Sequence, residues 1–143
     1  MSQVPDHYFN QSAVIPVRKH NGRLEVLLIS SRKRKRWVIP KGVKEPELSG
    51  PDSAAKEALE EAGIEGDVRP DALGTYRYDK WGGTCTVDVY LMFVAEVHDE
   101  WEERYRDREW VDVATAVERL QEPDLKKIVG RVPQMLASKH AAE

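Results

Sequence analysis

The chain has 143 residues, of which 41% are hydrophobic and 33% charged, and its formal net charge is -3. This length suits one domain over residues 1–143, and the composition is too apolar for a disordered tail. The net charge argues against general affinity for nucleic acid or anionic membranes, because both usually require a basic domain or face. The longest apolar run, residues 89–95, is far shorter than the ~20 residues of a membrane-spanning helix, and no secretory signal opens the chain. We therefore expect a cytoplasmic protein.

The first predicted elements form a β-hairpin. Val, Ile and Leu are frequent in residues 12–18 and 24–30, and the intervening Asn21-Gly22 pair tolerates positive φ angles. A short extended segment over residues 37–39 follows. The chain should therefore begin with two paired strands and a third, shorter one.

A helix is predicted after a loop that is rich in proline and glycine. These residues exclude helix over most of residues 40–51. Ser49 begins an S-x-x-D sequence that ends at Asp52, which is a common helix start, and Gly63 suits the position just past a helix end. The helix is expected over residues 50–62.

The second half of the chain predicts further strands and two helices. Apolar and polar residues alternate on either side of Gly82-Gly83, so this pair marks a turn between two strands, the second of them long and largely buried. The C-terminal helix should be interrupted near Pro133, because proline is poorly tolerated inside helices. We expect strands over residues 73–79, 84–98 and 109–113, and helices over residues 115–120 and 124–138.

Three carboxylates share one face of the helix predicted over residues 50–62. At about 100° per residue, Glu60 lies about −60° and Glu61 about +40° from Glu57. Like charges this close repel, and a Lys56–Glu60 pair offsets only part of the repulsion. A hard divalent ion such as Mg²⁺ would relieve it, because Mg²⁺ prefers carboxylate oxygens and bridges to phosphates. The residues expected to form the opposite, packing face are Ala55, Ala58, Leu59 and Ala62.

The same carboxylates have a simpler explanation. Glutamate is a good helix former, and an isolated E-x-x-E-E sequence is usually a solvated helix face. Here, however, residues 42–64 resemble the Nudix box, in which a glycine, a loop and a helix carry the sequence R-E-x-x-E-E-x-G. The residues that match are Gly42, Glu57, Glu60, Glu61 and Gly63.

Two positions depart from the Nudix box. Leu48 stands where the family usually has glutamate and Lys56 where it has arginine, and in the family these two residues pair with each other. Loss of both therefore looks like one altered contact, in which Leu48 packs against the helix and Lys56 pairs with Glu60. Because lysine lacks the planar fork of arginine, the change bears on the reaction rate.

The resemblance extends over most of residues 12–121. Part of it is to the diphosphoinositol polyphosphate phosphohydrolase branch, but Pro40-Lys41-Gly42 is closer to the dinucleoside polyphosphate hydrolases. The segments similar to the first branch are residues 26–31 with Arg36-Trp37, 95–102 and 108–117. The positions where basic residues of that branch are missing are Phe9, Gln11, Thr84 and Cys85.

The resemblance implies an α/β (α+β) fold, a Nudix-type α/β/α sandwich around a mixed β-sheet. It also implies hydrolysis of a phosphoanhydride bond in a polyphosphorylated small molecule, such as a diphosphoinositol polyphosphate or a dinucleoside polyphosphate. The cofactor would be Mg²⁺, for which Mn²⁺ can substitute, held by Glu57, Glu60, Glu61 and the Lys41 carbonyl. The ion would activate a water that attacks phosphorus. Glu60 or Glu57 would accept the proton, and residues 99–103 offer an alternative base.

A block of five basic residues, 32–36, precedes the Nudix loop, and the fold implied by the resemblance places it at the rim of the pocket. Clustered cations raise the local concentration of polyanions, and arginine binds phosphate in a bidentate manner. A solvated loop is the alternative explanation. The candidate substrate-binding residues are Ser31, Arg32, Arg34, Arg36, Lys41 and Arg108. Trp37 and Trp110 are expected to pack in the core, since each begins or ends a strand.

Two other functions fit parts of the sequence. A catalytically weak or silent Nudix domain that binds a nucleotide or inositol phosphate as a sensor would explain the altered Leu48 and Lys56, but the intact carboxylates argue against it. An RNA-binding module would use the basic block, but the net charge and the lack of a nucleic-acid motif disfavour it. We therefore expect a small polyphosphate as the partner, with no nucleic acid and no membrane.

Overall fold

The strands of the protein are β1 (Asn10–His20), β2 (Arg23–Ser30), β3 (Trp37–Val38), β4 (Lys41–Val43), β5 (Ile64–Val68), β6 (Gly74–Lys80), β7 (Gly83–Val97) and β8 (Arg108–Asp112). Its helical elements are a 3-10 turn η1 (Asp6–Phe9), the helices α1 (Gly50–Glu57), α2 (Val113–Arg119) and α3 (Pro123–Ala141), and a π-helical turn η2 (Ala58–Ala62). This computed structural model describes residues 4–141, so residues 1–3 and 142–143 of the expected domain lie outside the described residues.

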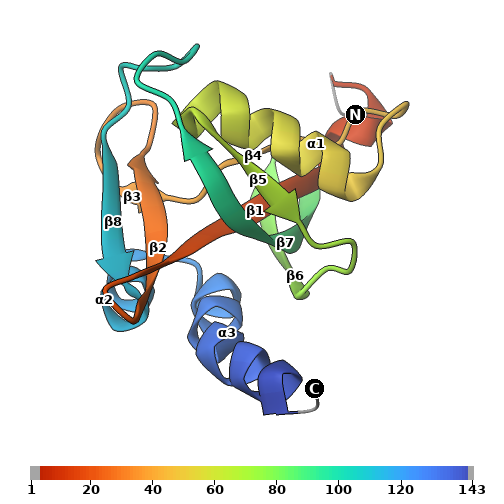
Figure 1. Ribbon diagram of the computed structural model, residues 1–143. Coiled ribbons are helices and arrows are strands. Elements are labelled where there is room, and N and C mark those ends of the chain that lie inside the picture. The colour runs from red at the N-terminus through yellow and green to blue at the C-terminus, as the bar shows by residue number, and fades with distance from the viewer. Residues whose placement is uncertain (1–3, 142–143) are drawn as a thin grey trace.

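The eight strands form one mixed sheet with helices on both faces (Figure 1). The order is β3-β2-β1-β7-β5, with β4 beside β1, β6 beside β7 and β8 beside β2. Only β1 and β7 run parallel among these described pairs; the others are antiparallel. The core below α1 is separate from the core below α2 and α3. This arrangement confirms the mixed α+β sandwich predicted from the sequence.

Strand β1 lies at the centre because it pairs with β2, β4 and β7. Ala13, Ile15 and Val17 pack in the core below α2 and α3, whereas Val14 packs in the core below α1. A strand that is buried on both faces needs a nearly continuous apolar sequence, which explains why this segment lacks a clean alternation of polar and apolar residues. The strand thus connects the two layers that carry the site described below.

The predicted hairpin is confirmed. Strands β1 and β2 pair up to His20 and Arg23, and the two residues between them, Asn21 and Gly22, have φ angles of 53° and 76°. Two positive φ angles in a two-residue loop match the twist of the flanking strands.

The second predicted turn lies one residue earlier than expected. Trp81 (φ 55°) and Gly82 (φ 71°) form the turn, and Gly83 already belongs to β7. A tryptophan rarely adopts a positive φ. Its ring packs against Tyr8 and Phe9, with ring centroids 5.4 and 6.1 Å away, and these contacts hold it there.

Two short strands were not expected, and one expectation about the C-terminal helix is corrected. The sequence does not predict β4 and β5, which are three and five residues long and belong to a sheet only through their partners β1 and β7. The expected interruption of the C-terminal helix near Pro133 is wrong, because α3 continues through it. Val129 and Val132 are fully buried against the sheet, and this packing outweighs the single hydrogen bond that proline removes. No helix among residues 4–141 has the length and apolar character needed to cross a membrane.

Candidate active site

The acidic helix begins as predicted. The Ser49 hydroxyl accepts the N–H of Asp52 at 3.1 Å, and Pro51 occupies the first turn. Because proline has the φ angle of a helix and needs no hydrogen-bond partner for its nitrogen there, this start is stable. The cap sets where the helix starts and therefore which residues reach the sheet edge two to three turns later.

The last turn of this helix is a π turn, η2, rather than a regular α turn. The packing face consists of Ala54, Ala58 and Ala62, all fully buried, whereas Leu59 is 41% exposed. The expectation that Leu59 packs inward is therefore wrong, because regular 100° spacing does not hold where the helix widens. Gly63 ends the turn at a φ of 65°. A Cβ there would lie 2.8 Å from the Cβ of Trp101, so glycine is required on two counts.

Two of the predicted carboxylates meet strand β4. Oε1 of Glu61 accepts the backbone N–H of Lys41 at 3.1 Å. The Glu57 carboxylate occupies the space beside Gly42, where an ideal Cβ would lie 2.2 Å from Glu57 Cδ. Glycine at position 42 is thus what allows the helix carboxylate to reach the sheet edge. Glu60 is half-buried on the same helix and lies 3.3 Å from the Lys56 amine.

Burial and mutual repulsion destabilise the charged forms of these carboxylates. Burial raises the pKa of Glu57 to about 8, and the charges of Glu61 and Glu60 contribute to the rise. Burial also raises the pKa of Glu61 to about 7, although the charge of Arg106 and the N–H of Lys41 oppose it. An excess of buried negative charge made of carboxylate oxygens is the donor set that Mg²⁺ and similar hard ions prefer. The residues present therefore fit a divalent cation.

A loop distant in sequence supplies two more residues to this cluster. Arg106 is only 6% exposed, and its guanidinium donates to Glu103 Oε1 at 2.9 and 3.1 Å and to the Ser30 carbonyl at 3.0 Å. It also lies 3.8 Å from Glu61 Oε2. Glu103 belongs to the acidic stretch that the sequence offers as an alternative base. Arg106 was not among the candidates, because a single arginine in a charged loop carries no local signal.

The Lys41 side chain joins a polar network beside the core below α2 and α3, within reach of the charge of Glu61. Its amine donates to the Tyr78 hydroxyl at 3.0 Å, and that hydroxyl donates to Gln11 Oε1 at 2.7 Å. Burial lowers the pKa of the Lys41 amine. The negative charges of Glu61 and Glu122 oppose this shift, whereas the positive charge of Arg36 adds to it. Lys41 therefore connects the carboxylates, through its backbone, to a polar network on the other face. Its predicted carbonyl contact with the metal stays a prediction.

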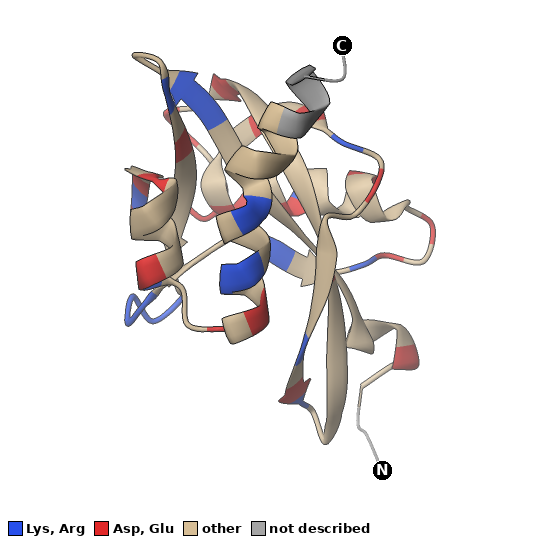
Figure 2. Ribbon diagram, turned by 90° about the horizontal axis from the view of Figure 1, so that it is seen from below, with Lys and Arg blue, Asp and Glu red and all other residues tan. Residues whose placement is uncertain are grey.

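The basic block forms a tight exposed loop at one side of the molecule (Figure 2). The Ser31 hydroxyl accepts the N–H groups of Lys35 and Arg36 and so closes the loop. Arg34 binds both carboxylate oxygens of Asp107 at 2.8 Å, and Arg36 binds Glu122 at 3.1 Å. Two of the predicted phosphate-binding arginines thus already have carboxylate partners, whereas Arg32 is exposed.

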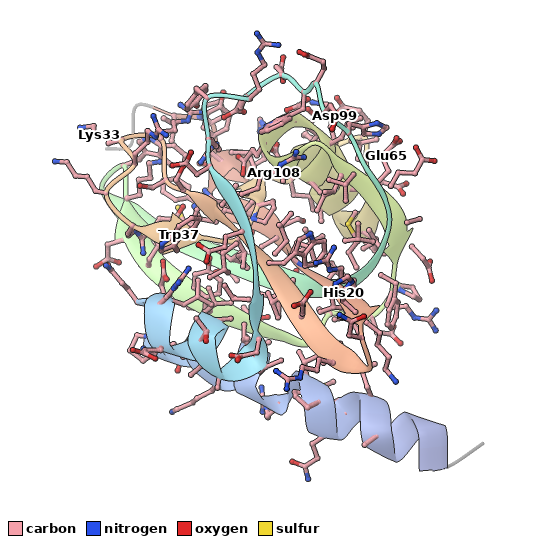
Figure 3. The ribbon with its side chains drawn as sticks, turned by 60° about the vertical axis from the view of Figure 1, so that its left-hand side comes forward. His20, Lys33, Trp37, Glu65, Asp99 and Arg108 are labelled. Atoms are coloured by element: carbon pink, nitrogen blue, oxygen red, sulfur yellow. The ribbon has the colours of Figure 1, made fainter. Side chains whose placement is uncertain are left out.

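Arg108 lies against the C-terminal end of the acidic helix, and Lys33 points outward from its loop (Figure 3). The Arg108 guanidinium donates to the carbonyls of Ala62 and His98 at 3.0 and 2.9 Å and stacks on the Trp101 ring at 3.8 Å. Through these contacts Arg108 satisfies a carbonyl at the C-terminal end of the acidic helix. Substrate binding by Arg108 stays a prediction.

Lys56, one of the two residues that depart from the Nudix box, has an ion-pair partner that the sequence did not predict. Lys56 pairs with Glu60 at 3.3 Å, as expected, but also with Glu45 Oε1 at 2.7 Å. Glu45, three residues before Leu48, therefore supplies the loop carboxylate that position 48 lacks. Neighbouring positions in a loop can reach the same helix site, and the sequence pattern alone does not reveal which one does.

Comparisons with known proteins identify the family of the chain. A model of the NUDIX domain family matches residues 9–132. The mitochondrial Nudix hydrolase 13 of Arabidopsis thaliana is 36% identical over 107 residues, which are 67% of this chain and 53% of the relative. Diphosphoinositol polyphosphate phosphohydrolase 3-beta of Bos taurus is 32% identical over 120 residues, which are 82% of this chain and 72% of the relative. The chain spans about half the length of several such relatives, including the Arabidopsis protein.

Solved structures share the fold. The crystal structure of a Caenorhabditis elegans Ap4A hydrolase binary complex has a TM-score of 0.78 and 22% sequence identity, covering 90% of this chain and 98% of that one. At this identity the likeness concerns the fold alone. The family match, however, spans most of the chain and includes Gly42, the three helix carboxylates and Gly63. The chain therefore belongs to the NUDIX domain family.

Proposed function

We propose that the chain is a Mg²⁺-dependent pyrophosphohydrolase that cleaves a phosphoanhydride bond in a polyphosphorylated small molecule. The observation that carries the proposal is the convergence of Glu57 and Glu61 on strand β4, where burial raises both pKa values. A bound Mg²⁺ or Mn²⁺ would balance this charge and lower the pKa of a water that attacks phosphorus. The family and the names of the relatives point to the same class of reaction.

The acidic residues divide into ligands and a base. Glu57 and Glu61 would hold the ion, because they are the two that reach the sheet edge. Glu60, more exposed and next to Lys56, remains our proposed base, since a base must exchange its proton with solvent. Glu103 is the alternative, because Arg106 fixes its carboxylate close enough to raise the pKa values of Glu57 and Glu61.

Cations of the loop and of strand β4 would bind the substrate phosphates. Arg36 and Lys41 lie close enough for their charges to interact, and Arg32 is exposed on the same loop. Arg34 and Ser31 would shape the loop through their bonds to Asp107 and to the loop backbone. Several cations at one site attract a polyanion more strongly than a singly charged molecule.

The substrate class follows from these cations and from the relatives. A diphosphoinositol polyphosphate and a dinucleoside polyphosphate both combine several phosphates with a phosphoanhydride bond, and relatives named for each type resemble this chain. We propose that the substrate belongs to one of these two classes. A small polyphosphate rather than nucleic acid also suits the net charge of -3.

A substrate screen with a matched variant tests the proposal. Purified protein would be incubated with Mg²⁺ and diphosphoinositol polyphosphates, dinucleoside polyphosphates or nucleoside triphosphates, and the products of phosphoanhydride cleavage (phosphate, pyrophosphate or nucleotides) would be separated and quantified. We expect one class to be hydrolysed, with no turnover in EDTA. Glu61→Gln should abolish turnover without unfolding the protein, whereas Glu118→Gln, an exposed change on α2, should leave it unchanged. Near-normal activity of folded Glu61→Gln would refute the assignment of the metal site.

The same screen separates the enzyme from a sensor. A silent binding domain would bind one of these compounds without hydrolysing it at any Mg²⁺ concentration. The Lys56–Glu45 pair weakens the reason for favouring a sensor, because the contact that the altered box was expected to lack is replaced. Binding without turnover would nevertheless decide for the sensor.

A further inference from the structure

We propose that Trp101 is a positioning residue for the metal carboxylates, acting through the π turn η2. This inference rests on the proposed metal site of Glu57 and Glu61. Trp101 lies on the segment that joins β7 to β8, about forty residues after the helix, and its indole N–H donates to the backbone carbonyl of Glu61 at 3.1 Å. It thus binds the backbone of a residue whose side chain is proposed to hold the ion.

Trp101 is one of four donors that this segment supplies to the helix end. The last carbonyls of a helix lack partners within the helix and must be satisfied from outside. Here four consecutive carbonyls each accept a bond from residues 98–108. The pairs are Glu60 O with Glu103 N at 3.0 Å, Glu61 O with Trp101 Nε1 at 3.1 Å, Ala62 O with Arg108 Nη1 at 3.0 Å, and Gly63 O with His98 N at 2.8 Å. The segment therefore caps the whole C-terminal end of the helix.

The capped turn has a geometry that needs support. In η2 the N–H of Gly63 is shared between the carbonyls of Ala58 and Leu59, so the chain makes a wider turn than an α-helix. π turns are rare, occur mostly as single turns within α-helices and are frequent at functional sites. A wider turn changes the angle between Glu57 and Glu61, and these two must reach Gly42 and the Lys41 N–H at the same time. Whatever stabilises the π turn therefore also sets the spacing of the two carboxylates.

The Trp101 ring is fixed on both sides, so its N–H has a defined direction. An ideal Cβ at Gly63 would lie 2.8 Å from Trp101 Cβ and Cγ, which shows how closely the side chain approaches the end of the turn. The Arg108 guanidinium stacks 3.8 Å from the ring and itself donates to the Ala62 carbonyl. Packing against Gly63 and stacking under Arg108 do not require a nitrogen, whereas the bond to Glu61 does. The ring and the N–H can therefore be separated by mutation.

Trp101→Phe tests the proposal, because phenylalanine keeps an aromatic ring but removes the donor. The affinity for Mg²⁺, and for Mn²⁺ as a second probe, would be measured by calorimetry, together with kcat, KM and thermal unfolding. A neutral hydrogen bond sets the scale of the effect at about 3- to 10-fold. We expect the metal Kd to rise by that factor, kcat at low Mg²⁺ to fall in parallel, and KM for the substrate to change less than twofold. Saturating Mg²⁺ should restore most of kcat.

Trp37→Phe is the matched control, since Trp37 also lies near an arginine, Arg119 at 5.4 Å, but packs against the core below α2 and α3 rather than the core below the acidic helix. It should lower the unfolding temperature by a similar amount and leave the metal Kd unchanged. A metal Kd of folded Trp101→Phe within twofold of the parent would overturn the proposal. So would an equal rise in both variants, because the effect would then follow general stability.

Two further variants keep the outcome interpretable. If Trp101→Phe does not fold, Arg108→Met replaces it: methionine keeps an unbranched apolar side chain but removes both hydrogen bonds to the carbonyls of Ala62 and His98, and a normal metal Kd in that folded variant would reject the capping argument. Glu61→Gln tests the metal site itself. If Glu61→Gln binds metal as the parent does, the proposed function fails. If Glu61→Gln loses metal binding but Trp101→Phe keeps the parent affinity, only the positioning role of Trp101 is wrong.

Discussion

Gly42→Ala should disable the site while leaving the fold intact. An alanine Cβ at this position would lie 2.2 Å from Glu57 Cδ and 2.3 and 2.7 Å from its two oxygens. Ordinary contacts between such atoms are about 3.5–4.0 Å, so the carboxylate must retreat by roughly 1.3–1.8 Å. A misplacement of about 1 Å near a reacting centre can cost about 10²-fold in rate. We therefore expect kcat/KM to fall by at least about 100-fold and the affinity for Mg²⁺ to fall with it.

The fold should tolerate the same change. Gly42 does not have a positive φ, and the group that must move is the end of a flexible side chain. Alanine also costs less conformational entropy than glycine in a strand, so the unfolding temperature should shift by only a few degrees.

Gly130→Ala is the matched control for Gly42→Ala. A Cβ there would lie 3.8 Å from Val117 Cγ2, an ordinary contact, on the exposed side of α3. Alanine in a helix is favoured over glycine by about 1 kcal/mol, so this variant should be slightly more stable and equally active. Initial rates of substrate hydrolysis over a range of Mg²⁺ concentrations, with thermal unfolding of each variant, measure both effects. Parent-like kcat/KM in a folded Gly42→Ala protein would show that Glu57 does not need its present position.

Three other predictions follow from the contacts of the site. Glu45→Gln and Lys56→Met should show a coupling of about 0.2–1 kcal/mol in a double-mutant cycle of unfolding, as for exposed ion pairs, and strictly additive effects would contradict the pairing. The raised pKa values of Glu57 and Glu61 mean that the folded state holds the protons of these carboxyl groups more tightly than the unfolded chain does. The protonated carboxyl groups therefore stabilise the folded state fully below pH ~4.5, and this stabilisation is lost as the pH rises through about 7 to 8. In EDTA the unfolding temperature should thus fall from pH 5 to 8, and Mg²⁺ should raise it more at pH 8 than at pH 5; a flat profile with no metal effect would count against the buried carboxylates. Arg36→Gln should raise KM about tenfold and reduce its dependence on salt with little change in kcat, and an unchanged KM at low ionic strength would exclude Arg36 from phosphate binding.

Local signals in the sequence were sufficient for the elements that depend on neighbouring residues. The Asn21-Gly22 turn and the cap at Ser49 were predicted correctly, because backbone preference and capping act within a few residues. The Nudix box also placed Glu57 and Glu61 on one helix after a glycine, since their spacing is a property of the helix itself. The family, the mixed fold and the position of the carboxylate cluster thus followed from the sequence.

Tertiary structure decided everything that depends on partners far along the chain. Strand β5 exists because β7 offers it an edge, and α3 passes Pro133 because Val129 and Val132 are buried against the sheet. The π turn, the caps from Trp101 and the buried Arg106 depend on contacts about forty residues apart, which no periodicity encodes. The free energy of such contacts comes from burial and from satisfying polar groups in one particular three-dimensional arrangement. The sequence by itself therefore determined which chemical groups the protein has, and only the folded chain determined how they are held at the site.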